Sequence, residues 1–273
     1  MMKIADRLCF STLGCPEWTF EQTLEQAKAM GFAAIEIRGI GAELNTARLP
    51  CLLPENRAQT QALLEKHGVR ICGLNTSVAF HDPAKREEAL SEGEAALGIC
   101  KEMGIPAIRV FGDAIPKGEA TETVTQRVIS GLSTLSDQAP EGTKVLLEIH
   151  GSFNTVETVA PLLSALGNHP GFGILWDIEH SFHACGNDTG AFYSLIRPYI
   201  VHTHIKGCRS LPTGSECCLP GEGDLDAAQL IGWMERDGYQ GLYSFEWEKR
   251  WHPELAAPEA AFPGFVSFMK GLT

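Results

Sequence analysis

The chain has 273 residues, 44% of them hydrophobic, and a formal net charge of −12 at pH 7. This acidic balance argues against a nucleic-acid partner, which usually requires a basic face. No run of about 18 apolar residues occurs, so we expect no membrane span. The N-terminal residues lack the apolar run of a signal peptide, and the nine cysteines include no Cys-x-x-Cys pair. We therefore expect a reduced, cytoplasmic protein.

Short apolar segments alternate with helical segments along the whole chain. In chain order, the expected pairs of strand and helix are 8–13 with 19–30, 34–38 with 54–67, 69–74 with 82–103, 107–111 with 119–135, 145–150 with 154–167, 172–178 with 190–196, 200–206 with 225–236, and 242–247 with 258–269. Strict alternation predicts a parallel sheet, and eight units in a chain of this length fit a closed (β/α)8 TIM barrel.

The alternative fold is a doubly wound open sheet. Its dinucleotide-binding form would need a Gly-x-Gly-x-x-Gly turn before the first helix, and the sequence has none. No linker, low-complexity run or internal repeat divides the chain. We therefore expect residues 1–273 to form a single TIM-barrel domain, with its chemistry at the carboxyl ends of the strands.

The apolar segment 145–150 ends in two polar residues, Glu148 and His150. Both point to the same side, because side chains alternate along a strand. A buried carboxylate or imidazole needs compensation, and a metal ion would supply it. Each of the three following strands also carries an acidic residue or a histidine at the same end of the barrel. The predicted ligands are Glu148, Asp177, His204 and Glu246.

Three carboxylates and one imidazole suit Mn²⁺, Mg²⁺ or Co²⁺ better than a structural Zn²⁺ site. Open coordination positions would take the vicinal oxygens of a hydroxy-ketone, and a neighbouring carboxylate could remove the proton beside the carbonyl. Taken singly, each residue could be a loop anchor or an ion-pair partner. His202 could support His204 through a hydrogen bond, and His150 could support a loop. The agreement of four adjacent strands favours the metal site.

Several segments carry a family resemblance that covers nearly the whole chain: 11–16, 31–38, 109–112, 148–151, 176–180, 202–206, 221–224 and Glu246. In these segments the chain resembles the xylose isomerase-like barrel superfamily of sugar-phosphate isomerases and epimerases. The resemblance implies one divalent metal ion, Mn²⁺ or Mg²⁺ before Co²⁺ or Zn²⁺, bound at the four positions predicted above. It also implies a small carbohydrate substrate.

The resemblance implies catalytic roles for Glu148, Glu246 and His180. The two glutamates flank the substrate; one removes a proton beside the carbonyl, the other returns one, and the metal holds the enediolate between these steps. Residues implied in substrate binding are His150, His180, His202, Lys206 and Arg209. For Lys206 and Arg209, an ordinary solvent-facing loop position is the alternative.

The sequence differs from the epimerases of the family at one place, and this difference leaves two classes of reaction open. Ketose 3-epimerases of the family usually carry a further glutamate where this chain has Ser152-Phe153-Asn154. The pairs Glu148-x-His150 and Asp177-x-x-His180 resemble family dehydratases that act on dehydroshikimate or keto-inositol, in which a histidine near the metal takes the proton. The first hypothesis is an isomerase or epimerase, and the alternative is a dehydratase. An AP-endonuclease-like nuclease and a non-catalytic binding protein are minor alternatives, and a homo-oligomer is left open.

Overall fold

The computed structural model describes residues 3–272, apart from the side chain of Asn187. Its parallel strands close into a barrel in the order β1-β10-β7-β6-β5-β4-β3-β2, so the predicted (β/α)8 fold is confirmed. The strands are β1 (Leu8–Ser11), β2 (Ala34–Ile37), β3 (Arg70–Ala79), β4 (Ala107–Phe111), β5 (Lys144–Glu148), β6 (Phe172–Asp177), β7 (Ile200–Ile205) and β10 (Tyr243–Phe245).

Nine α-helices accompany these strands in the described chain. They are α1 (Phe20–Met30), α2 (Arg57–His67), α3 (Arg86–Met103), α4 (Thr121–Gln138), α5 (Val156–Leu166), α6 (Ile178–Cys185), α7 (Thr189–Ile196), α8 (Ala227–Arg236) and α9 (Pro258–Lys270). Within residues 3–272, no helix combines the length and the apolar character needed to cross a membrane.

The chain divides into two compact units. The first unit comprises the described residues of Met1–Leu44, Leu49–Cys72 and His202–Thr273. In it, β1 pairs with both β2 and β10, and β10 pairs with β7. Two short antiparallel strands, β8 (Gly207–Ser210) and β9 (Ser215–Cys218), also belong to the first unit. This hairpin lies in a stretch for which the sequence predicted no regular structure.

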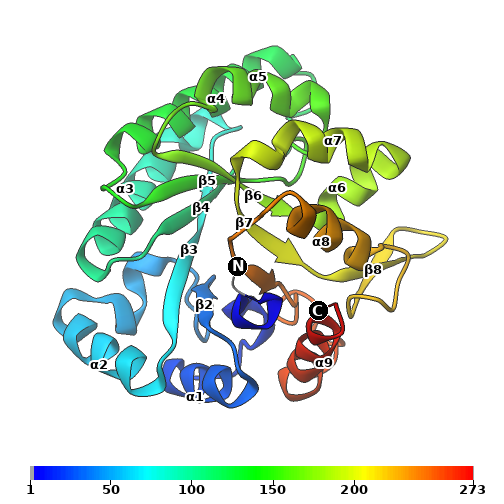
Figure 1. Ribbon diagram of the computed structural model, residues 1–273. Coiled ribbons are helices and arrows are strands. Elements are labelled where there is room, and N and C mark those ends of the chain that lie inside the picture. The colour runs from blue at the N-terminus through cyan, green and yellow to red at the C-terminus, as the bar shows by residue number, and fades with distance from the viewer. Residues whose placement is uncertain (1–2, 273) are drawn as a thin grey trace. The chain divides into compact units, whose positions relative to one another are not determined.

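The second unit comprises Asn45–Arg48 and Gly73–Val201. In it, β4 pairs with β3 and β5, and β5 pairs with β6. Helices α3, α4 and α5 follow the outer side of this sheet (Figure 1). All six residues of β6 are buried, as expected for a parallel strand with the barrel interior on one side and helices on the other. Helix α6 directly follows β6 and was not predicted.

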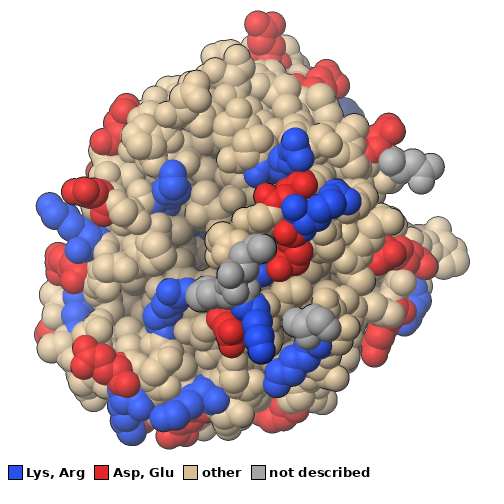
Figure 2. Space-filling view, viewed as in Figure 1, with Lys and Arg blue, Asp and Glu red and all other residues tan. Residues whose placement is uncertain are grey.

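Acidic and basic side chains are interspersed over the face shown in Figure 2. The acidic side chains on this face lie apart from one another and do not form one extended acidic area.

Gly131 allows close packing between α4 and the end of β3. A Cβ added to Gly131 would lie 2.3 Å from Cγ of the buried Phe80 ring. We therefore expect Gly131→Ala to lower the free energy of unfolding by about 1–3 kcal/mol, the usual cost of overpacking a core. Gly98→Ala in α3 is the matched control, since its Cβ would meet no atom within 4 Å and alanine favours the helix by about 0.5–1 kcal/mol. Urea unfolding measures both variants, and equal shifts would contradict the packing argument.

Candidate metal centre

In the first unit, His204 and Glu246 lie on paired strands. Ser244 of β10 is in register with His204 of β7. Glu246, which directly follows β10, therefore lies beside the end of β7. His204 Nδ1 is 3.2 Å from Glu246 Oε1. Both side chains are buried, with 0% and 5% of the residue surface exposed. The structure thus brings two of the four predicted ligands together within this unit.

Lys206 holds the second oxygen of Glu246. Its ammonium donates hydrogen bonds to Glu246 Oε2 at 2.7 Å and to Glu248 Oε1 at 2.8 Å. Burial raises the pKa of Glu246, but His204 and Lys206 outweigh it and hold that pKa well below its usual value. Glu246 is therefore an ionised carboxylate with a fixed orientation. Lys206 is fully buried, so the solvent-facing alternative is wrong for this residue.

A buried carboxylate that the sequence analysis did not single out, Glu36 of β2, lies next to these groups. Its Oε2 is 2.8 Å from His202 Nε2, and its Oε1 accepts a hydrogen bond from Ser244 Oγ at 2.7 Å. The same Oε1 is 2.9 Å from His204 Nε2. Burial raises the pKa of Glu36, but His204 and His202 more than offset this and lower it. The sequence feature that could have indicated a buried site residue is the single carboxylate, Glu36, within the otherwise apolar strand Ala34–Ile37.

In the second unit, Glu148 ends β5 next to the buried Arg109 of β4. The register pairs Phe111 with Glu148, and Arg109 Nε is 3.1 Å from Glu148 Oε2. The guanidinium carbon of Arg109 also lies 3.9 Å from the centre of the Phe111 ring. Glu148 and Arg109 are each 2% exposed. Arg109 is the first residue of segment 109–112 of the family resemblance, and the sequence does not predict its place beside Glu148.

Asp177 has two structural roles, as the last residue of β6 and as the N-cap of α6. Its Oδ1 accepts hydrogen bonds from the backbone N–H groups of Glu179 at 2.8 Å and His180 at 3.2 Å. An N-cap carboxylate satisfies backbone donors that have no partner inside the helix. These contacts fix the orientation of the carboxylate at the strand end.

His150 and His180 lie next to each other in the second unit. Their ring centres are 4.3 Å apart in an edge-to-face arrangement, and His180 Nε2 is 3.9 Å from Asp177 Oδ2. Burial lowers the pKa of His150, although the charge of Glu148 acts in the opposite direction. The neutral imidazole is therefore favoured at His150.

The remaining predicted substrate contacts have different surroundings. His202 is buried against Glu36. Arg209 lies on β8, where its side chain is 47% exposed and its Nη1 donates to Glu216 Oε1 at 2.6 Å. Its Nη2 donates to the carbonyl oxygen of Glu222 at 3.1 Å. Substrate contact stays a prediction for both residues.

Buried carboxylates gather at the site in each unit. In the first unit, Glu36 and Glu246 accompany the ammonium of Lys206 and the imidazoles of His202 and His204; in the second, Glu148 and Asp177 accompany Arg109. Buried carboxylates need a compensating charge. Carboxylate oxygens and one imidazole nitrogen are suitable ligands for Mn²⁺ or Mg²⁺. The donor set therefore fits a divalent cation.

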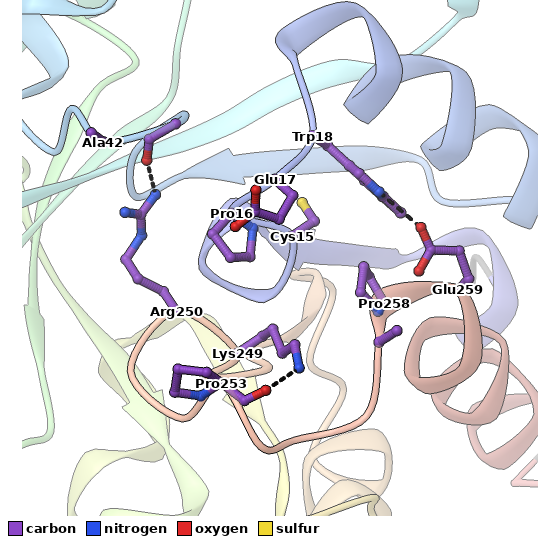
Figure 3. A pocket seen from close by; sticks show the side chains of 12 residues that line it. Cys15, Pro16, Glu17, Trp18, Ala42, Lys249, Arg250, Pro253, Pro258 and Glu259 are labelled. Atoms are coloured by element: carbon purple, nitrogen blue, oxygen red, sulfur yellow. Dashed lines mark hydrogen bonds between the residues drawn. The ribbon is translucent and has the colours of Figure 1, made fainter.

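A pocket of about 620 Å³ lies in the first unit, between the segments that follow β1, β2 and β10 and the start of α9. Trp18 Nε1 donates to Glu259 Oε1 at 3.0 Å, and Arg250 Nη2 donates to the Gly41 carbonyl oxygen at 2.6 Å (Figure 3). Lys249 donates to the carbonyl oxygen of Pro253. The contacts of Arg250 and Glu259 connect the chain after Glu246 to the segments that follow β2 and β1, and the Lys249 contact lies within that part of the chain. None of the predicted site residues is among those lining the pocket.

Comparison with known proteins agrees with the fold, and two of the similar proteins are named for an enzymatic activity. The family model described as xylose isomerase-like TIM barrel matches residues 24–262. An inosose isomerase of Halalkalibacterium halodurans is 24% identical over 249 residues, covering 87% of this chain and 86% of the relative. An inosose dehydratase of Yersinia enterocolitica is 24% identical over 276 residues, covering 89% and 86%. The crystal structure of the IolI protein with bound zinc has a TM-score of 0.80 at 20% identity and covers 97% of both chains.

Proposed function

Because the chain belongs to the xylose isomerase-like TIM-barrel family, we propose that it is a divalent-metal-dependent isomerase or epimerase of a small keto-polyol. The inosose isomerase and inosose dehydratase among its relatives support a substrate of the inosose class. The two relatives are equally identical to this chain, so their names support a sugar-modifying enzyme but do not select the reaction.

We further propose that Glu148, Asp177, His204 and Glu246 hold one metal ion, with Mn²⁺ or Mg²⁺ favoured. Each of these residues lies at or directly beside the carboxyl end of a barrel strand, where TIM-barrel enzymes carry their chemistry. The buried carboxylates and the imidazole of His204 are the donor types that support a cation there. When bound, such an ion would polarise the carbonyl group of a keto-polyol.

The observation that carries the isomerase proposal is the geometry of Glu246. Its carboxylate is ionised, and its oxygens are held by His204 and Lys206. An ionised carboxylate held in one orientation can accept the proton from the carbon beside the carbonyl, and a metal ion that polarises the carbonyl would make that proton more acidic. In the proposed reaction, Glu148 enters as the carboxylic acid and delivers its proton to the same carbon from the opposite face of the substrate. Exchange with water then takes the proton from Glu246 and restores the proton on Glu148, so both groups return to their starting states. The atoms of substrate and product are the same, so no further reactant is needed.

Dehydration is the second candidate, and His150 favours it. A neutral imidazole can accept the proton beside the carbonyl, and burial keeps His150 in that form. His180, 4.3 Å away between ring centres, could then protonate the departing hydroxyl group of the adjacent carbon. The products would be water and an unsaturated ketone.

Incubation of the Mn²⁺-loaded protein with an inosose in heavy water distinguishes the two reactions. We expect an isomeric product of the original composition that carries deuterium at an exchanged carbon position. A product lighter by one water molecule would instead identify the dehydratase. Mass spectrometry of the product and NMR of the exchanged position provide the readouts.

The control for this experiment is the same protein carrying both Glu148→Gln and Glu246→Gln, which should neither exchange deuterium nor form product. If the unaltered protein forms no product and exchanges no deuterium with any inosose or with simple ketoses, the proposed chemistry is wrong. Exchange that persists in the double variant would assign the proton transfer to other residues.

A further inference from the structure

We propose that the pocket of the first unit binds the phosphate group of a small organic molecule through Lys249 and Arg250. The pocket is formed by the segments that follow β1, β2 and β10 and by the start of α9, and none of the proposed metal ligands lines it. The inference goes beyond the proposed function, because binding at this site needs neither a metal ion nor proton transfer.

The two basic residues of the pocket are held by backbone carbonyl oxygens. Lys249 Nζ donates to the carbonyl oxygens of Pro253 and Leu255, and Arg250 Nη2 donates to that of Gly41 (Figure 3). In the described part of the chain, neither cation forms an ion pair with a carboxylate. The carbonyl contacts fix the two side chains but leave both charges without a paired carboxylate. Two neighbouring cations in fixed positions therefore line one cavity.

The guanidinium of Arg250 also has a donor that the protein itself does not use. Its Nε is buried and has no hydrogen-bond partner among the described groups. Burial lowers the pKa of Arg250, although Cys15 and Glu17 act in the opposite direction. An unsatisfied donor on a partly buried cation is unfavourable unless a ligand compensates it. Phosphate is such a ligand, because its oxygens match the planar N–H groups of arginine.

The first turn of α9 adds a further source of positive potential. Ala257, the N-cap of this 13-residue helix, and Pro258, its first residue, both line the pocket. The amino end of a helix carries a partial positive charge and favours phosphate, and an alanine cannot cap its N–H groups. Glu259 in the same turn opposes this effect in part. It is an exposed residue, however, and its Oε1 accepts the hydrogen bond from Trp18 Nε1.

The charge, size and lining of the pocket define the class of ligand. Two cations and a helix end match a phosphate monoester, with its charge of about −1.5 to −2 at pH 7, better than a carboxylate. The volume of about 620 Å³ is typical of a small-molecule site and far larger than one phosphate ion. Pro16, Trp18 and Pro253 also line the pocket and offer apolar surface to the rest of the ligand. We therefore expect an organic phosphate about the size of a sugar phosphate.

Isothermal titration calorimetry of the full chain with inorganic phosphate and with glucose 6-phosphate tests the inference. We expect both to bind, and the sugar phosphate to bind more tightly. Arg250→Gln should raise both Kd values by about tenfold or more, because a hydrogen bond to a charged group contributes at least this factor. The matched control is Arg236→Gln, which removes the same charge at the end of α8, outside the pocket. It should change either Kd by less than about twofold.

A second pair of variants keeps the test decisive if Arg250→Gln loses stability. Aspartate and asparagine are both favoured N-cap residues, so Ala257→Asp and Ala257→Asn should each preserve or raise the unfolding midpoint. Only the aspartate adds a negative charge to the lining of the pocket. We therefore expect Ala257→Asp to raise the Kd for glucose 6-phosphate by about tenfold or more, and Ala257→Asn to raise it far less.

No binding of either phosphate at millimolar concentration would overturn the inference, as would the same Kd in the unaltered protein, Arg250→Gln and Ala257→Asp. Acetate that binds as tightly as phosphate would overturn the assignment of a phosphate ligand. Binding that disappears when a chelator is added would place the phosphate on a metal ion and also contradict the inference. Proton exchange in heavy water is measured separately, so failure of this site and failure of the proposed function are distinguishable.

Discussion

Removing divalent ions with a chelator should abolish turnover of an inosose, and adding Mn²⁺ should restore it. A metal ion that polarises a carbonyl contributes several kcal/mol to stabilising the transition state. Its loss should therefore lower kcat by about a thousandfold or more, since each 1.4 kcal/mol corresponds to about tenfold. The measurement is the initial rate of product formation before chelation, after it, and after the addition of one equivalent of Mn²⁺.

Circular dichroism and the unfolding midpoint of the chelated protein provide the control for this experiment. The barrel core is formed by apolar side chains of the strands and helices, so we expect the chelated protein to stay folded. Full activity of a chelated protein shown by elemental analysis to be metal-free would contradict a metal-dependent reaction. Loss of activity together with unfolding would identify the ion as structural.

The change from Glu246 to glutamine should stop proton transfer while keeping the fold. The amide cannot act as a base, and general acid–base catalysis typically contributes about 10²–10⁴-fold to the rate. We therefore expect kcat to fall by about that factor and deuterium incorporation into the substrate to fall with it. The shape of the side chain is kept, so the unfolding midpoint should change far less than the rate.

Glu248→Gln is the matched control, because Glu246 and Glu248 both accept a hydrogen bond from the ammonium of Lys206, at 2.7 and 2.8 Å. Glu248 is not a proposed ligand, so its replacement should lower kcat by less than about tenfold and leave deuterium exchange measurable. Equal losses in the two variants would mean that Lys206, and not the basicity of Glu246, controls the rate. Undiminished exchange in Glu246→Gln would exclude Glu246 as the base.

The strands were predictable because each contains a short apolar segment, although β3 continues to Ala79, beyond the predicted end at residue 74. Segments 34–38 and 107–111, for example, correspond to β2 and β4 within one residue. The hairpin β8–β9 was missed because each strand has only four residues, with the buried residues together at one end and the exposed ones at the other, so no apolar alternation marks it. Helix α6 was missed because its capping residue, Asp177, directly ends a strand; the sequence pattern does not separate an N-cap at a strand end from a metal ligand.

The candidate site was predictable only in part, for a physical reason. Strand-end acids and histidines can be read from the chain, because the barrel brings strand ends together. The partners that orient them cannot, because Glu36 lies 166 positions from His202 and 208 from Ser244 along the chain. The same holds for Lys206. Only the structure reveals that its ammonium binds the carboxylates of Glu246 and Glu248, which lie about forty positions further along the chain. The cytoplasmic location and the state of association stay predictions.

The most direct test of the metal centre is anomalous diffraction at the manganese edge from crystals grown with Mn²⁺. We expect one strong anomalous peak, with Glu148, Asp177, His204 and Glu246 as its protein ligands. A second group in the first unit, the buried side chains of Cys9, Cys72 and His202, also has ligand atoms within 4.8 Å of one another. A peak at this second group alone, or no peak at the four proposed ligands, would contradict the account.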